Sequence, residues 1–187
     1  RSPGPGRLEP AFRRQHHRPR PPARGRRPQG RWRKRGICDE ALGRSRGGFT
    51  TKIHIRAEGL GKPVTFSLTG GQVHDTQQFA TLMGTGWIRR LGRGRPRLKP
   101  DRVAGDKAYS SGKIRDALRR RGIGAVIPTK ENERRQPDFD REAYRERNRI
   151  ERLINRLKQF RRIATRYEKR AANYLAMITI AAILLWL

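Results

Sequence analysis

The sequence predicts an α/β domain over residues 39–187, and three observations support this. Residues 49–57 and 62–69 have strand character, and a Gly-Leu-Gly turn at 59–61 joins them. Residues 140–169 contain no Gly or Pro and many strong helix formers, which predicts one long helix. The composition changes abruptly near Asp39, where an Arg/Pro-rich text gives way to these periodic segments. We therefore expect a boundary at about residue 38.

Further elements complete the predicted order. A helix is expected from His74 to about Met83, with Asp75 or Thr76 as its N-cap and His74 in a loop or capping role. A short apolar segment, Val103-Ala104, leads to Asp106. A helix that starts at Ser110-Ser111-Gly112 and runs to about Arg121 follows. A buried strand at 124–129, the long helix and an apolar helix at 171–187 follow. From residue 39 the expected order is β-β-α-β-α-β-α-α.

The predicted long helix carries two stripes of side chains. At about 100° per residue, the apolar residues gather on one core face: Ile150, Leu153, Ile154, Leu157 and Phe160. A second stripe beside that face holds Tyr144, Arg147, Glu151 and Lys158. On an arbitrary helix such a stripe is a solvated face with i,i+4 ion pairs.

The spacing of the second stripe matches a known pattern. Tyr-x2-Arg-x3-Glu-x6-Lys resembles the signature of insertion-sequence DDE transposases, and the surrounding text RNRIERLINRLKQFRRIATRYEK is similar to that family too. The resemblance implies that Glu151 is the third metal-binding carboxylate. It also implies that Tyr144, Arg147 and Lys158 hold DNA phosphates. The implied fold is a ribonuclease-H-like domain, with a mixed sheet flanked by helices.

A second stretch carries the same resemblance. Gly-Asp-Lys-Ala-Tyr-Ser-Ser, which contains Asp106, is similar to the second carboxylate motif of the family. The resemblance implies that Asp106 and Glu151 bind Mg²⁺, with Mn²⁺ as a substitute, for cleavage and strand transfer of DNA. Lys107 and Tyr109 are further candidates for DNA contacts. The implied partners are the double-stranded DNA of the element ends and of the target, and a homodimer in the DNA complex is left open.

The first metal-binding Asp of the family is absent from this sequence. No segment like Asp-Ser-Thr-x-Val-x-Ala-His precedes Gly-Arg-Ser-Arg-Gly-Gly, and neither Asp39 nor Asp75 follows a first strand. The sequence therefore predicts an incomplete ribonuclease-H-like domain that lacks its central first strand and is inactive alone. Residues 1–38 hold seven of the 12 prolines and no periodic pattern, so we expect disorder there.

Residues 1–37 are interpreted as a coding frame read out of register. Synonymous codons for residues 7–23, read one base further along, permit Val-Asp-Ser-Thr-Ile-Val-Arg-Ala-His. That text resembles the missing first strand with its Asp. The nucleotide sequence decides whether the permitted reading is the real one.

The charge indicates a polyanionic partner. The net charge is +30, with 46 Lys and Arg against 16 Asp and Glu, which favours nucleic acid. Charge alone also fits a second class, a basic non-catalytic nucleic-acid-binding protein of ribosomal or chromatin type.

The single Cys38 excludes an internal disulfide, and the histidines lack metal-ligand spacing. We expect a bacterial, DNA-associated cytoplasmic protein, with residues 171–187 as a core helix and not as a membrane anchor.

Overall fold

The computed structural model describes residues 40–45, 48–88, 92–133 and 136–187, and the backbone of residues 8–17. Six strands form the sheet: β1 (Leu8–His17), β2 (Gly43–Ser45), β3 (Gly48–Ala57), β4 (Pro63–Gly70), β5 (Arg102–Gly105) and β6 (Gly124–Val126). Their order is β2-β3-β1-β5-β6, and β4 also pairs with β3. The β1–β5 and β5–β6 pairs are parallel and the others antiparallel, so the sheet is mixed, as the sequence predicts.

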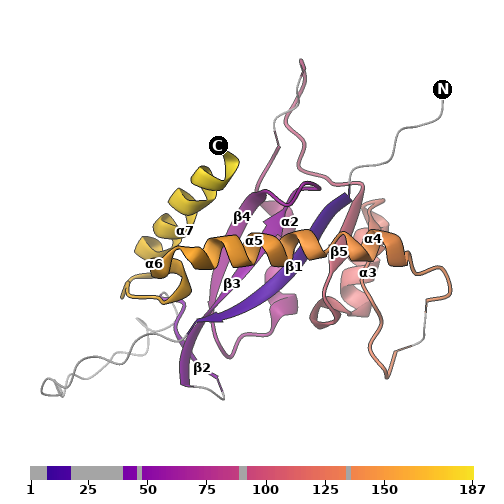
Figure 1. The fold of residues 1–187 in the computed structure, drawn as a ribbon. Helices are drawn as coiled ribbons and strands as arrows, with labels where there is room; N and C mark the ends of the chain where they lie inside the picture. Colours follow the sequence, from indigo (N-terminus) through magenta and orange to yellow (C-terminus); the bar gives the residue numbers. More distant parts are fainter. Residues whose placement is uncertain (1–7, 18–39, 46–47, 89–91, 134–135) are drawn as a thin grey trace, which may run out of the picture.

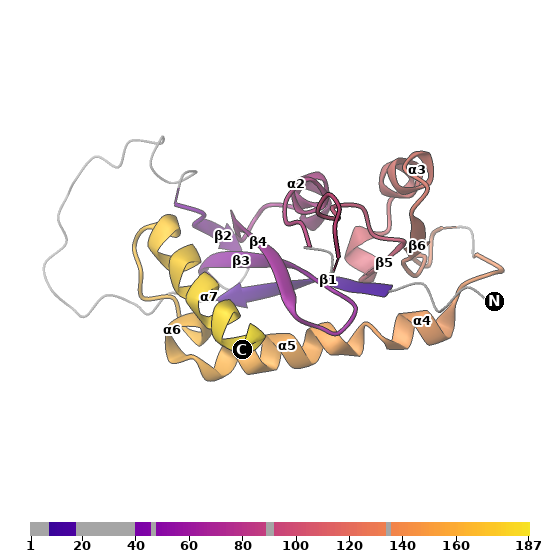
Figure 2. The same cartoon turned by 90° about the horizontal axis from the view of Figure 1, so that it is seen from above.

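Helices cover both faces of this sheet, as Figures 1 and 2 show. One face carries η1 (Asp75–Gln78), α2 (Phe79–Gly84) and α3 (Gly112–Arg120), and the short η2 (Lys107–Tyr109) follows β5. The other face carries α4 (Arg141–Arg145), α5 (Asn148–Gln159), α6 (Arg161–Ala164) and α7 (Ala171–Trp186). The result is a three-layer arrangement with an apolar core on each side of the sheet.

Strand β1 differs from the expectation for residues 1–38. It lies at the centre of the sheet, antiparallel to β3 and parallel to β5, where disorder and a missing strand were expected. An extended chain at this place supplies hydrogen-bonding groups to two neighbouring strand edges at once, a gain that needs no side-chain periodicity. The register shifts between Glu9 and Phe12, around Pro10, which has no N–H to donate. Residues 1–7 and 18–38 lie outside the described part of the chain.

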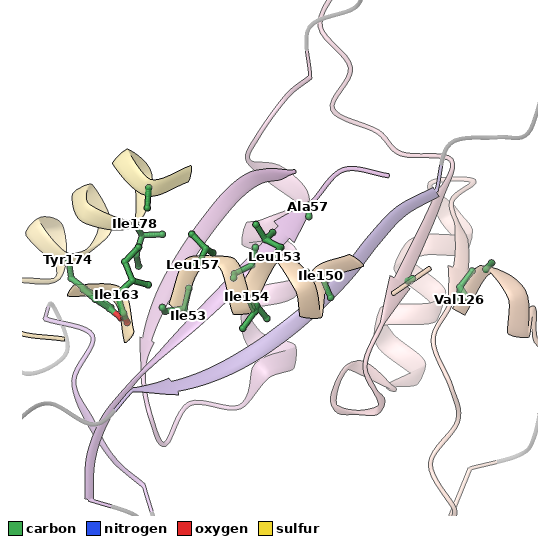
Figure 3. Packing of buried hydrophobic residues seen from close by; sticks show 14 residues of the cluster. Ile53, Ala57, Val126, Ile150, Leu153, Ile154, Leu157, Ile163, Tyr174 and Ile178 are labelled. Carbon is green, nitrogen blue, oxygen red and sulfur yellow. The ribbon is translucent and has the colours of Figure 1, made fainter. Parts of the chain in front are cut away.

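The predicted core face of the long helix is confirmed. Ile150, Leu153, Ile154 and Leu157 are at most 2% exposed, and Phe160 is partly buried against the same cluster. They pack with Ile53, Ile55 and Ala57 of β3 (Figure 3). The alternation of β3 is confirmed as well, because His54 lies on the opposite face from Ile53 and Ile55.

The single helix expected over residues 140–169 is wrong in its continuity. The Asp140 carboxylate caps α4 by accepting a hydrogen bond from the Ala143 N–H. Between α4 and α5, backbone N–H groups donate to the carbonyl three residues earlier instead of four. Arg147 N–H thus donates to Tyr144 C=O, a tighter 3₁₀-type geometry. Phe160 then adopts extended angles (φ −77°, ψ 107°) and ends α5. Propensity favoured one helix, and tertiary packing of Phe160 on the core redirected the chain.

Helix α7 packs one face on the core. Tyr174, Ile178, Ala181 and Ala182 are buried, while Ile180, Ile183 and Leu184 are more than half exposed. Among the described residues, none of the helices has the length and apolar character needed to span a bilayer. The expected core helix is therefore confirmed for one face of α7 only.

Candidate active site

Asp106 stands where β5 ends. Its backbone is still extended (φ −73°, ψ 161°), and its carboxylate accepts a 2.6 Å bond from Lys107 N–H at the start of η2. Side chains alternate along a strand, and Ala104 belongs to the core cluster of α5. Asp106, two residues later, is therefore directed toward the α5 face of the sheet and is partly exposed.

Glu151 approaches from the helix on that same face. It follows Ile150, which is 0% exposed and packs in the cluster with Ala104, so the helix backbone is fixed directly beside the carboxylate. Glu151 itself is 32% exposed, and its Oε1 lies 2.8 Å from Nη2 of Arg147. The structure thus places both predicted carboxylates on one face, one from a strand end and one from the first turn of α5.

Tyr144 and Arg147 form a stacked pair with this carboxylate. The Arg147 guanidinium lies 5.2 Å from the centre of the Tyr144 ring, which itself packs on Phe139 at 5.4 Å. Nε of Arg147 is buried and has no hydrogen-bond partner among the residues that the structure describes, so aromatic contact and the Glu151 ion pair hold the side chain. Tyr144, Arg147 and Glu151, predicted from spacing alone, do come together.

Lys158 is exposed on α5, seven residues beyond Glu151. Seven residues are nearly two turns, or about 10 Å along the helix, so Lys158 continues the same stripe. Its position next to solvent permits a contact with a second phosphate of a DNA strand.

Tyr109 is not available for DNA, which corrects that part of the sequence analysis. Its side chain is 0% exposed, and its hydroxyl lies 3.5 Å from Nδ1 of His54, whose Nε2 lies 2.8 Å from Thr69 Oγ1. The contact anchors the turn that carries Asp106 to β3 and β4. Lys107, in contrast, is exposed.

Sequence reasoning missed the polar face of β3. Lys52 donates to Val73 C=O at 2.5 Å and pairs with Asp75 at 3.2 Å, and both side chains are nearly completely buried. Asp75 is therefore an ion-pair partner and not the N-cap of η1, a role that His74 fills through the Thr76 N–H. Arg56 is 2% exposed and donates to backbone carbonyls, among them that of Leu98 at 2.9 Å. The alternation of Lys52, His54 and Arg56 with Ile53 and Ile55 was the available signal, but the alternation alone does not reveal that the polar face is buried.

Arg166 is a second buried cation that spacing did not reveal. It is 2% exposed and donates to Thr51 Oγ1 at 2.5 Å and to the carbonyls of Glu40 and Lys169 at 2.9 and 3.0 Å. Burial lowers the pKa of this guanidinium from its ordinary value, and burial raises the pKa of the adjacent Tyr174 phenol. The buried cations Lys52, Arg56 and Arg166 therefore bind groups within the fold and are not exposed to a partner.

The fit to a metal ion is incomplete in the part of the chain that the structure describes. Asp106 and Glu151 supply the oxygen ligands that Mg²⁺ prefers. No group of three or more His, Cys, Asp or Glu residues that could hold a metal was found among the described residues. Two carboxylates are present where the expected site needs three.

The chain matches the family described as "Transposase DDE domain" over residues 12–186. It is 30% identical over 141 residues to a putative transposase for insertion sequence element IS6501 from Brucella ovis, covering 74% of this chain and 99% of that protein. It is 33% identical over 135 residues to a putative transposase for IS402 from Burkholderia cepacia, covering 72% of this chain and 62% of that protein.

The family match and the two relatives thus show a protein of the transposase class, and the mixed sheet flanked by helices is compatible with that class. More particularly, the chain belongs to the DDE transposase family of insertion sequences, whose members act in DNA transposition and generally use divalent metal ions. The family match begins at residue 12, inside the segment that the sequence analysis set apart. The alternative of a ribosomal or chromatin-type protein is not favoured by these findings.

Proposed function

We propose that this chain carries the catalytic face of a transposase that cleaves DNA at element ends and transfers the strand to target DNA. Asp106 and Glu151 would hold the metal ions, and Arg147, Tyr144 and Lys158 would position the scissile strand. The observation that supports this best is the ion pair between Arg147 and Glu151 at 2.8 Å, on a helix whose Ile150 shares a core cluster with Ala104 of the strand that leads to Asp106. When bound, divalent ions supply Lewis-acid stabilisation of the displacement at phosphorus.

We also propose that the chain as it stands neither nicks nor joins DNA. Two carboxylates bind a pair of divalent ions more weakly than three, because fewer anionic oxygens offset the loss of hydration. The group expected to complete the site lies on the first strand. β1 supports this location, since Phe12 is paired with Gly105, so the next residues of β1 run beside Asp106.

The out-of-register interpretation of residues 1–37 fits the same location. The Asp of the alternative reading falls on the codons of Arg14 and Gln15, two residues past the Phe12–Gly105 pair. A carboxylate at this level of β1 would stand on the strand next to Asp106. Sequencing the gene tests the interpretation, and stop codons or the lack of Asp-Ser-Thr in the other frame would exclude it.

The experiment compares this chain with a variant whose residues 13–21 are replaced by Val-Asp-Ser-Thr-Ile-Val-Arg-Ala-His. Both are incubated with supercoiled plasmid that carries the DNA flanking the reading frame, in Mg²⁺ or Mn²⁺. We expect nicking by the restored variant only, and its loss on Glu151→Gln. Nicking by the unaltered chain that disappears in both Asp106→Ala and Glu151→Ala would show that another residue completes the site.

A further inference from the structure

Neither α7 nor the adjacent strand β4 contains a charged residue, and the cation at their margin is Lys62, whose Nζ lies 4.9 Å from the centre of the Trp186 ring and donates to Trp186 C=O at 3.0 Å. Residues 171–187 and 63–70 contain no Asp, Glu, Lys or Arg, although 33% of the chain is charged. The α7/β4 surface, as we call it, consists of β4 and five large apolar side chains with exposures of 43% to 97%: Ile180, Ile183, Leu184, Trp186 and Leu187. Single exposed apolar residues are ordinary, but a continuous set on one helix marks an interaction site.

A groove lies within this surface. It has a volume of about 370 Å³ and runs between β4 and α7, lined by Val64, Phe66, Leu175, Thr179, Ile183 and Trp186. Nε1 of Trp186 donates to Pro63 C=O at 2.7 Å and fixes one wall. The groove therefore has a defined apolar shape into which side chains of a partner can insert.

Strand β4 adds an open edge. In the described sheet it pairs only with β3, over Thr51–Ala57, so its other edge presents backbone N–H and C=O groups. Natural edge strands are commonly protected by charges or bulges, and β4 has no charge to repel a second strand. The unpaired edge of β4 lies beside the apolar face of α7, so this surface suits a partner that also has an unpaired strand edge and an apolar helix.

We propose that the occupant of the α7/β4 surface is a second copy of this chain, related by a twofold axis. A surface with an open strand edge and an apolar helix is self-complementary, because antiparallel edges and helices pair with their own copies. Two chains of net charge +30 repel each other over cationic surfaces. The α7/β4 surface, with Lys62 at its margin as a cation already engaged with Trp186, is where two copies approach with little electrostatic cost.

The size of the surface fits this assembly. A stable interface buries about 800 Å² on each partner. Large apolar side chains have surfaces on the order of 200 Å² each, so the five exposed ones contribute on the order of 600 Å². The walls of the groove and the β4 edge supply the remainder.

The experiment measures the mass of the nucleic-acid-free chain by analytical ultracentrifugation over a range of micromolar concentrations. We expect a species of twice the 21.6 kDa chain mass. The dimer should strengthen toward about 1 M NaCl, where the Debye length is about 3 Å and like-charge repulsion is screened. DNA binding weakens under the same change, so the two functions respond to salt in opposite directions.

Charge substitutions test the interface. Ile183→Lys and Leu184→Lys, at 55% and 53% exposure, should each give folded monomers that still bind DNA, with a melting temperature lowered only by the lost dimerisation. The matched control is Trp87→Lys, which adds the same charge at a 65% exposed apolar residue outside the α7/β4 surface and should remain dimeric.

Three outcomes overturn the proposal. A monomeric wild type at every concentration and salt would show that no second copy binds. Folded dimers of Ile183→Lys would place the interface elsewhere. Flotation of the monomeric wild type with phosphatidylcholine vesicles, lost in Ile183→Lys, would assign the surface to a lipid bilayer. None of these results bears on the proposed chemistry of Asp106 and Glu151.

Discussion

Nη2 of Arg147 lies 2.8 Å from Oε1 of Glu151, one helical turn away. The Tyr144 ring supports the same guanidinium from 5.2 Å. The proposed phosphate-binding cation and the proposed metal-binding carboxylate therefore neutralise each other. A metal ion on Glu151 or a phosphate on Arg147 has to compete with this ion pair, so binding at the two residues is energetically linked.

Glu151→Gln should raise the affinity of the chain for duplex DNA by about two- to fivefold, because partly exposed ion pairs are worth up to about 1 kcal/mol. The substitution removes a negative charge and releases Arg147 to a phosphate. Fluorescence anisotropy with a labelled duplex at fixed salt measures the change.

Glu146→Gln is the matched control for that measurement. Glu146 is 35% exposed and pairs with Arg149, which also donates to Gly59 C=O and so stays held by the fold. We expect a smaller rise in affinity. Equal rises in both variants would mean that only net charge matters and that Arg147 does not contact DNA.

DNA affinity itself should depend steeply on salt and weakly on sequence. The net charge of +30 makes counterion release the main driving force. Between about 50 and 200 mM salt, the affinity should fall by about a thousandfold if six or more phosphates are contacted. Titrations of two unrelated duplexes at several salt concentrations measure this dependence, and a flat dependence would contradict it.

Tyr109→Phe should lower the stability of the fold without disturbing its surface. The substitution deletes the buried hydroxyl 3.5 Å from His54 Nδ1 and costs about 1 kcal/mol. For a domain of this size that loss lowers the melting temperature by about 2–4 °C. In the control Tyr167→Phe, the hydroxyl accepts from Arg161 Nε at 3.2 Å on the surface, and the melting temperature should hardly change. Equal melting temperatures of all three proteins would contradict the anchoring role.

Arg166→Lys should be far more destabilising than its conservative chemistry suggests. The planar guanidinium reaches Thr51, Glu40 and Lys169 at once, and an ammonium on a single stem cannot satisfy all of these acceptors. We expect a loss of about 3 kcal/mol or more in the free energy of unfolding, measured by urea titration. Arg162→Lys, at a 65% exposed residue, should lie within about 0.5 kcal/mol of wild type. Comparable stability of both variants would refute the role of Arg166.

Local periodicity explains which elements could be predicted. The strand at 49–57 and the core face of α5 were predicted correctly because their patterns repeat within a few residues. The cluster of Tyr144, Arg147 and Glu151 was predicted for the same reason, since all three lie within two helical turns.

Features that depend on distant partners could not be predicted. β1 forms by pairing with the edges of β3 and β5. No pattern within Leu8–His17 itself predicts a strand. The contact between His54 and Tyr109 joins residues 55 positions apart, and so Tyr109 was taken for a surface residue. The break at Phe160 likewise reflects packing on the core, because the local sequence favours a continuous helix.

The bonds of Arg166 and Ala171 bear on how the chain is made. Arg166 donates to the carbonyl of Glu40, and the Ala171 N–H donates to the Glu40 carboxylate at 2.6 Å, so the segment before β2 is held by residues more than 120 positions later. During translation the ribosome releases Glu40 long before either partner exists. The hydrogen bonds of Glu40, which precedes the β2–β3 hairpin, can therefore form only after nearly the whole polypeptide has been synthesised. A messenger cut short before the codon for Arg166 would yield a chain that lacks this fastening, and such a product should be a substrate for cellular proteases.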